Sequence, residues 1–197
     1  MLVDGVGLSS NSRERVLNAA EELFVKRGYE AVIIKDIAKA AGIHHASLYH
    51  HVPGGKPSLY VEVMTRHLQR YQAGMHAAIQ QPQENLESQL QSVGAWVIAH
   101  PPVNVIRLHN SDLPAIEAEA ADIISNLAFE ATLFPIVTVL EAAQQRGEIQ
   151  HESLGYMAGS LFASLEAIHA IPDQYLDLSR QSIANQIIEV FIRGLKA

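Results

Sequence analysis

The sequence of 197 residues contains no cysteine. This absence excludes a disulfide framework, a thiol nucleophile and any zinc site built on thiolates. No uninterrupted apolar run approaches the roughly 18 to 20 residues that a membrane span needs, so we expect no membrane partner. The start of the chain, MLVDGVGLSSNSRER, lacks the basic residues and the apolar core of a signal peptide. Together these absences predict a cytoplasmic protein.

Signatures of catalysis are also missing. The sequence has no Gly-rich phosphate loop, nucleophile elbow or kinase signature. Glu166 and His169 have the Glu-x-x-His spacing of di-iron bundles, but such a site needs this motif twice plus two further glutamates, and it occurs here once. His151 and Glu152 lack the second histidine of a zinc-protease helix. We therefore expect no catalytic residue, no metal site and no cofactor, and predict that the protein is not an enzyme.

The formal net charge of −7 is unevenly distributed. Residues 1–60 contain seven Lys or Arg against six Asp or Glu, a balance of +1. Residues 61–197 contain seven against fifteen, a balance of −8. Such asymmetry favours two segments with different functions, although an acidic surface that keeps the protein soluble explains part of it.

Apolar residues recur three and four positions apart along nearly the whole chain, without sustained period-two alternation, which predicts an all-α protein. Residues 1–11 are rich in Gly and Ser and are expected to be a flexible arm. Ser12 is expected to cap the first helix and Gly28 to end it. Further helices are expected over residues 35–41, 45–51, 58–80, 86–100, 116–146 with a kink or break at Pro135, 151–170 and 178–196, with a short segment at 103–110.

Residues 36–52, DIAKAAGIHHASLYHHV, have the form of two short helices joined by a glycine turn, a helix-turn-helix. Ala38 is small where the two helices approach, and Gly42 supplies the backbone freedom of the turn. Three apolar side chains can then point inward against the first helix: Ile37, Ile43 and Leu48. The polar residues of the second helix are consequently left on its outer face.

A longer stretch, RVLNAAEELFVKRGYEAVIIKDIAKAAGIHHASLYHHVPGGKPSLY, closely resembles the N-terminal domain of the TetR/AcrR family of one-component transcriptional regulators. The resemblance covers about residues 13–60, and the rest of the chain matches that family only in general layout. It implies a three-helix helix-turn-helix DNA-binding domain at residues 12–57 and a helical bundle for ligand binding and dimerisation at residues 58–197. It also implies a homodimer whose recognition helices enter successive major grooves of a palindromic double-stranded DNA operator.

The resemblance further implies which residues contact DNA. Tyr49, His51 and Lys56 lie where the family contacts phosphates, and a cation near a helix start adds to backbone N–H groups that already favour an anion. The remaining predicted DNA-binding residues, most of them at or near base-reading positions, are Lys35, His44, His45, Ala46, Ser47 and His50. The family usually carries Ser or Thr near Ile34, where a hydroxyl caps the second helix or touches a phosphate. Isoleucine can do neither.

The four histidines of this stretch suggest a metal site as an alternative. Adjacent helix residues point about 100° apart, so His50 and His51 cannot easily share one ion. The nearest carboxylate, Asp36, lies in the preceding helix. We therefore favour histidines that contact DNA, whose partial protonation near neutral pH would make phosphate affinity depend on pH.

The C-terminal part shows two patterns that bear on function. A stripe of small residues would let another helix approach closely: Gly155, Gly159, Ala163 and Ala167. With the apolar row of the final helix, it predicts a homodimer through the last two helices. The predicted ligand-binding residues are aromatic, Met and His side chains in apolar surroundings: Tyr71, Met75, Trp96, His100, His109, Phe129 and Phe134. Few basic residues lie near them, which favours a neutral or weakly polar small-molecule effector.

Taken together, the sequence predicts a ligand-responsive DNA-binding transcriptional regulator, a repressor released from its operator by a small-molecule effector. The alternative is a helical ligand-binding or scaffolding protein without DNA binding. Ile34 and the near-neutral N-terminal segment favour that alternative. Binding to its own upstream DNA that weakens with salt separates the two.

Overall fold

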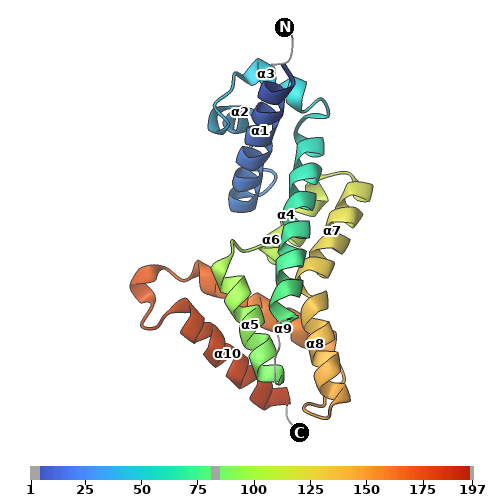
Figure 1. Cartoon of the computed structure of the whole chain (residues 1–197), viewed down its shortest axis with the longest axis vertical. Helices are drawn as coiled ribbons and strands as arrows, with labels where there is room; N and C mark the ends of the chain where they lie inside the picture. The colour runs from blue at the N-terminus through green and yellow to red at the C-terminus, as the bar shows by residue number, and fades with distance from the viewer. Residues whose placement is uncertain (1–4, 81–84, 196–197) are drawn as a thin grey trace. The chain divides into compact units, whose positions relative to one another are not determined.

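The computed structural model describes residues 5–80 and 85–195, and within these ranges it contains helices and no strand (Figure 1). The prediction of an all-α chain with an N-terminal helix-turn-helix is therefore confirmed. The chain forms two compact units, residues 1–67 with 106–125 and residues 68–105 with 126–197. The first unit extends past the expected boundary between residues 57 and 58, because the helix that begins at Gly55 runs unbroken into the second unit.

The first unit is built around three N-terminal helices and the start of the fourth: α1 (Gly5–Arg27), α2 (Ile34–Ala40), α3 (His45–His51) and α4 (Gly55–Ile79). The apolar face of each helix is buried, which follows from the three- and four-residue spacing of its apolar positions. Phe24 of α1 meets Tyr60 of α4 edge to face, with ring centroids 5.1 Å apart. Fully buried residues around this pair include Val16, Ala20, Ile37, Leu48, Leu59 and Val63.

The start of α1 differs from the prediction. The helix begins at Gly5, so Ser12 lies inside it and is not its cap. Residues 5–11 of the predicted flexible arm are thus helical, and residues 1–4 lie outside the described part of the chain. The Gly and Ser residues of this segment have weak helix propensity, which is why sequence alone favoured an arm.

A segment much later in the chain completes the first unit. It contains α6 (Val105–Arg107), the π-helix η1 (Leu108–Asp112), the 3-10 helix η2 (Leu113–Ala115) and the first part of α7 (Ala118–Thr132). The sequence predicted a short segment at residues 103–110, but not the π-helix. π-Helices are rare and often occur at functional sites.

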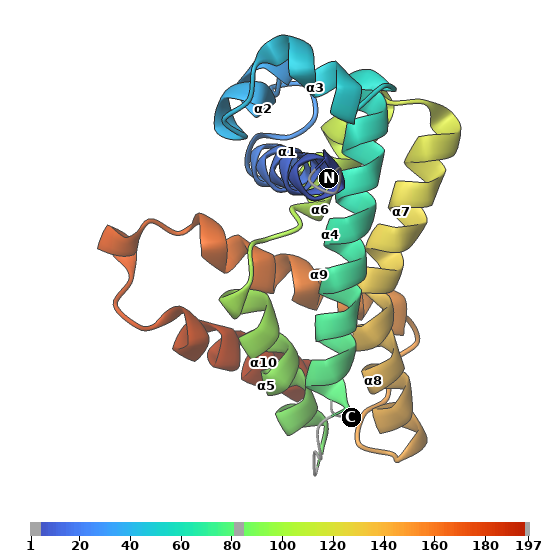
Figure 2. The same cartoon turned by 45° about the horizontal axis from the view of Figure 1, so that its top comes forward.

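The second unit contains α5 (Leu86–Ala99), α8 (Phe134–Gln145), α9 (Leu154–Ala167) and α10 (Arg180–Leu195), together with the ends of α4 and α7. Two 3-10 turns, η3 (Ile168–Ala170) and η4 (Asp173–Tyr175), join α9 to α10. Helices α5 and α10 lie side by side (Figures 1 and 2). A Cβ placed on Gly94 of α5 would come within 2.9 Å of Ile188 Cδ1, so the two helices approach closely at this crossing.

Pro135 separates α7 from α8, as the sequence predicted. Helix α7 ends at Thr132, α8 begins at Phe134, and the two are bent by 44°. Proline lacks an N–H and clashes with the preceding turn, which is a sufficient cause of this break. Among the described residues no single helix is long and apolar enough to cross a membrane, although this bent pair passes by length and composition.

Candidate DNA-binding site

The turn between α2 and α3 has the geometry that its sequence requires. Gly42 has a φ of +66°, a left-handed conformation that glycine adopts without strain. The Ile43 N–H donates to the carbonyl of Ala38 at 3.0 Å and so closes the end of α2. Ala38 is buried at the contact of the two helices. The predicted helix-turn-helix is therefore present, with Ile43 half-buried beside the fully buried Leu48.

Helix α3 presents a polar face to solvent. Leu48 within the helix and Val52 at its end are buried against the first unit. The His45 and Tyr49 rings lie one turn apart and meet edge to face, with centroids 5.6 Å apart. His51 is half-buried, whereas the exposed residues here are His44, His45, Ala46, Ser47, Tyr49 and His50. No group of three or more His, Asp or Glu in the described residues is arranged to hold a metal ion.

Lys56 lies in the first turn of α4, next to the end of α3. Its ammonium is 4.1 Å from the centroid of the Tyr29 ring, a cation–π contact. Burial lowers the pKa of the Lys56 amine, while the charges of Glu30 and Asp112 act in the opposite direction. Lys56, the predicted phosphate contact, is therefore a cation that lies over the face of the Tyr29 ring.

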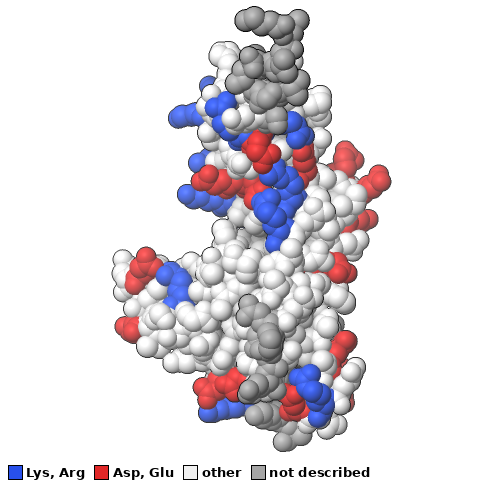
Figure 3. Space-filling view, viewed as in Figure 1, with Lys and Arg blue, Asp and Glu red and all other residues white. Residues whose placement is uncertain are grey.

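Lysine and arginine side chains gather around α1 and α2 on the face shown in Figure 3. Lys35 and Lys39 of α2 are exposed, and Arg27 at the end of α1 lies 3.7 Å from the Asp36 carboxylate. Lys35, a predicted DNA-binding residue, is therefore accessible to solvent on α2. Acidic side chains lie among these cations in the same view, so the charges nearest a bound duplex would matter more to DNA than the net charge of the chain, because charges are screened within about 10 Å at 0.1 M salt.

Two residues of the first unit that the sequence did not single out meet the end of α1. The Arg107 guanidinium donates to the carbonyls of Phe24 and Val25 at 3.3 and 2.8 Å. The buried Asp112 carboxylate accepts from the Tyr29 N–H at 2.8 Å. More than 80 positions separate these partners in the sequence, and no periodicity relates them.

The predicted ligand-binding residues do not form one group. In the second unit, Tyr71 packs edge to face against Trp96 at 6.1 Å, and His100 stacks on the same indole. Met75 is also fully buried. The indole covers Gly74, where an added Cβ would overlap it. His109 belongs to the first unit, and its side chain is exposed.

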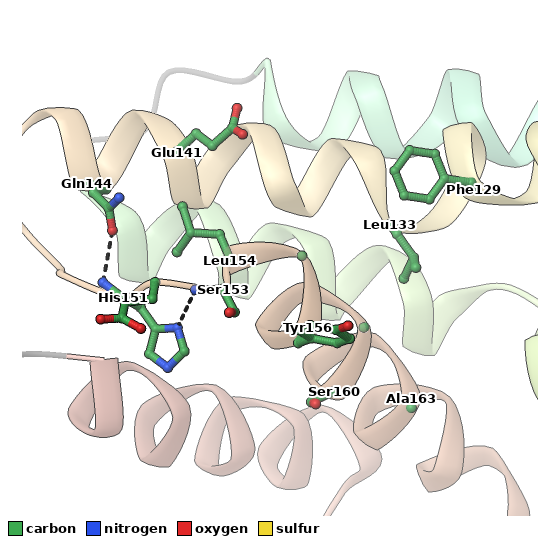
Figure 4. Close-up of a pocket in the computed structure, with 13 residues that line it drawn as sticks. Phe129, Leu133, Glu141, Gln144, His151, Ser153, Leu154, Tyr156, Ser160 and Ala163 are labelled. Atoms are coloured by element: carbon green, nitrogen blue, oxygen red, sulfur yellow. Dashed lines mark hydrogen bonds between the residues drawn. The ribbon is translucent and has the colours of Figure 1, made fainter.

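Phe129 and Phe134 occupy a different place in the second unit. Their ring centroids are 6.3 Å apart, and the side chains are 46% and 41% exposed. Phe129 lines a groove of about 890 Å³ between the α7–α8 pair and α9, together with Leu133, Tyr156 and Gly159 (Figure 4). At one end of the groove, His151 accepts a hydrogen bond from the Ser153 N–H at 3.0 Å. Solvent exposure therefore distinguishes Phe129 and Phe134 from the packed rings of Tyr71, Trp96 and His100.

The Glu-x-x-His motif of α9 and η3 has structural partners. The Glu166 carboxylate accepts from the Asn104 N–H at 2.9 Å and the Val105 N–H at 3.3 Å, and so caps the start of α6. His169 Nε2 donates to the Val97 carbonyl at 2.9 Å. Burial raises the pKa of Glu166 despite these backbone hydrogen bonds. Both side chains thus bind backbone groups.

Comparison with known proteins agrees with this geometry. The family profile described as "Bacterial regulatory proteins, tetR family" matches residues 16–63, which include the whole helix-turn-helix. This N-terminal segment is thus similar to that of tetR-family regulatory proteins. The chain is also similar to the HTH-type transcriptional regulator LmrA of Bacillus subtilis, with 34% identity over 86 residues, 42% of this chain and 46% of LmrA. It spans less than half the length of the curated relatives it matches.

Solved structures extend the tetR-type fold to nearly the whole chain. A tetR-family regulatory protein from Rhodococcus RHA1 superposes with a TM-score of 0.75 over 94% of this chain and 97% of that protein, at 19% identity. AibR, solved with isovaleryl coenzyme A and operator DNA, gives 0.73 over 91% and 97%, at 20% identity. The helical C-terminal region therefore shares the fold of these proteins.

Proposed function

We propose that the protein is a dimeric, ligand-responsive, DNA-binding transcriptional regulator that acts in the cytoplasm as a repressor and has no enzymatic activity. The observation that carries this proposal is the exposed polar face of α3. Leu48 and Val52 anchor the helix, while His45, Tyr49 and its other polar residues face outward. A short helix anchored in this way fits the major groove of DNA. Lys56 beside it is placed to contact the adjoining phosphate backbone.

In the proposed complex each α3 enters one major groove, and the two half-sites lie about 34 Å apart, one turn of DNA. Ser47 and His50 can hydrogen-bond to base edges, and the small Ala46 side chain allows close approach or contact with a thymine methyl group. Tyr49, Lys56 and the exposed Lys35 are assigned to phosphates, which set the register of the protein on the duplex.

The effector is proposed to bind in the second unit, near the aromatic group of Tyr71, Trp96 and His100. The rings of this group pack against one another, and uncharged aromatic surroundings of this kind suit a neutral or weakly polar molecule. AibR, which has the same fold, binds an acyl thioester of coenzyme A. Because coenzyme A carries phosphate charges, its acyl thioesters enter the effector screen as the charged alternative to a neutral molecule. A ligand would act by favouring a separation of the two α3 helices that no longer fits adjacent grooves.

The decisive experiment measures binding to the DNA upstream of the protein's own gene at several salt concentrations. Tyr49→Ala and Lys56→Ala should each weaken binding, and Lys56→Ala should lower the salt dependence by about one phosphate per protomer. Tyr175→Ala, at a tyrosine that is 69% exposed in the second unit, is the matched control and should bind normally. If both variants bind like the wild type, the assignment of these residues is wrong. If the wild type does not bind any DNA in a salt-dependent way, the scaffolding alternative is favoured.

A further inference from the structure

The end of α1 is held by a side chain from a distant part of the chain. Arg107 donates to the carbonyls of Phe24, Val25 and Lys26 at 3.3, 2.8 and 3.4 Å. The last carbonyls of a helix have no partner within it and carry the negative end of the helix dipole. The guanidinium supplies both the hydrogen bonds and the opposite charge. It therefore fixes the direction in which the chain leaves α1.

Asp112 holds the next residues of the same turn. Its carboxylate is 3% exposed and accepts from the Tyr29 N–H at 2.8 Å and from Arg107 Nε at 3.4 Å. Gly28 has a φ of +82°, and a Cβ there would lie 2.8 Å from Asp112 Oδ1. The turn therefore needs glycine both for its backbone conformation and for the close approach of the carboxylate. Arg107 and Asp112 together fix the backbone of Tyr29.

Tyr29 in turn determines where a cation is held. Its ring lies 6.2 Å from Phe24 and 4.9 Å from Tyr60 between ring centroids, so it has little freedom to turn. The free face of the ring carries the Lys56 ammonium at 4.1 Å. A lysine held in this way loses less conformational freedom when it binds a phosphate than one that rotates in solvent.

We propose that Arg107 and Asp112 are positioning residues for DNA binding, because they fix the turn that places the Tyr29 ring and, through it, the Lys56 ammonium. This proposal rests on the proposed function. Both residues lie outside the predicted DNA-binding domain of residues 12–57 and outside the matched family segment. The part of the protein that supports DNA binding thus includes the π-helix η1, which ends at Asp112.

Substitution of Asp112 by Asn separates a positioning role from a simple electrostatic effect, because the two predict changes of DNA affinity in opposite directions. Asp112→Asn removes a negative charge, which by Coulomb attraction alone would strengthen binding to DNA. The amide keeps an acceptor for the Tyr29 N–H but loses the ionic contact with Arg107. If Asp112 positions Lys56, the substitution weakens binding. Asp122→Asn is the matched control, because this aspartate is exposed in the same unit and its loss should leave binding unchanged or slightly tighter.

The test uses full-length protein and a duplex that the wild type selects from a random-sequence library, with binding followed by fluorescence anisotropy from low to high salt. Lys56→Gln should weaken binding and lower the salt slope by about one per protomer. Asp112→Asn should weaken binding about tenfold and lower the slope in the same direction. The double variant should bind like Lys56→Gln alone, because Asp112 acts through Lys56.

Two further measurements separate positioning from loss of fold. Circular dichroism checks that each variant is folded at the assay temperature. Arg107→Lys serves if Asp112→Asn unfolds, since a lysine keeps the charge but lacks the planar guanidinium whose separate nitrogens reach the three carbonyls and Asp112. Arg107→Lys should also weaken DNA binding. Combined with Lys56→Gln, it should weaken binding no further than Lys56→Gln does alone. The proposal is overturned if the folded variants bind DNA as tightly as the wild type. It is also overturned if the fold-loss of affinity in a double variant is the product of the losses of its two single variants, one of which is Lys56→Gln. Failure of the wild type to select any duplex would instead overturn the proposed function.

Discussion

At the scale of single residues, the carboxylate of Glu166 combines burial with a capping role. It accepts hydrogen bonds from the Asn104 and Val105 N–H groups, and burial raises its pKa. The folded chain therefore binds this proton more tightly than the unfolded chain does. By linkage, ionisation of Glu166 makes stability fall as the pH rises from its unfolded pKa, about 4.3, through the higher pKa of the folded state.

Substitution of Glu166 by Gln removes this ionisation. We expect Glu166→Gln to gain stability relative to the wild type as the pH rises from about 4 to 7. Urea denaturation at a series of pH values gives the difference directly. Glu152→Gln, at an exposed glutamate, measures the effect of losing one acidic charge alone. If Glu166→Gln instead loses stability relative to the wild type with rising pH, the backbone hydrogen bonds outweigh the cost of burial.

Much of the candidate site could be predicted residue by residue, because exposure on a short helix follows from its apolar pattern. Once Leu48 is buried, Tyr49 and His50 must face outward, as they do. Arg107 and Asp112 could not be found in this way. Their partners lie more than 80 positions earlier in the chain, and hydrogen bonds between distant segments leave no periodic pattern. The groove that Phe129 lines is likewise closed by residues of α9 far along the sequence, so its shape could not be read from the local pattern.

At the scale of elements, α2 begins without a side-chain cap. Ile33 is its N-cap residue, is 54% exposed and makes no capping hydrogen bond. The sequence predicted that a capping hydroxyl is missing near Ile34, which is one residue after Ile33. The backbone of Ile33, with φ −111° and ψ 151°, is already extended, as an N-cap requires.

A serine at this position should therefore stabilise the helix. We expect Ile33→Ser to raise the free energy of unfolding by about 1 kcal/mol, because its hydroxyl can accept from backbone N–H groups of the first turn. Guanidinium denaturation measures the change. Ile33→Ala removes the same exposed apolar surface without supplying a cap, so a serine variant no more stable than the alanine variant would contradict this explanation. Ile34→Ser, one residue inside the helix, should not stabilise it.

The helix bounds show what local patterns can and cannot determine. Helix α3 covers the predicted residues 45–51, and both Gly28 and Gly42 adopt the left-handed conformation expected of helix-ending glycines. These features depend on local propensity and steric freedom. The π-helix at Leu108–Asp112 depends on contacts with α1 instead, so its geometry could not be read from its own residues.

At the scale of the whole molecule, the predicted dimer requires a surface that one chain leaves uncovered. On α9, a Cβ added at Gly155 or Gly159 would meet nothing within 4 Å. Tyr156 beside them is 79% exposed, and Val190 of α10 is 71% exposed. An apolar surface of this kind on a chain with a tetR-type fold supports a two-fold interface built from α9 and α10.

A bulky residue on the α9 stripe should separate the two protomers without unfolding either. We expect Gly159→Trp to be monomeric at micromolar concentration by analytical ultracentrifugation, with the circular dichroism of the wild type, because the open space at Gly159 accepts the side chain within one chain. Its operator binding should weaken steeply, since a monomer contacts only one half-site. Gln69→Trp, at an exposed position of α4, should remain dimeric. A dimeric Gly159→Trp would place the interface on another face, and a monomeric wild type would exclude the dimer.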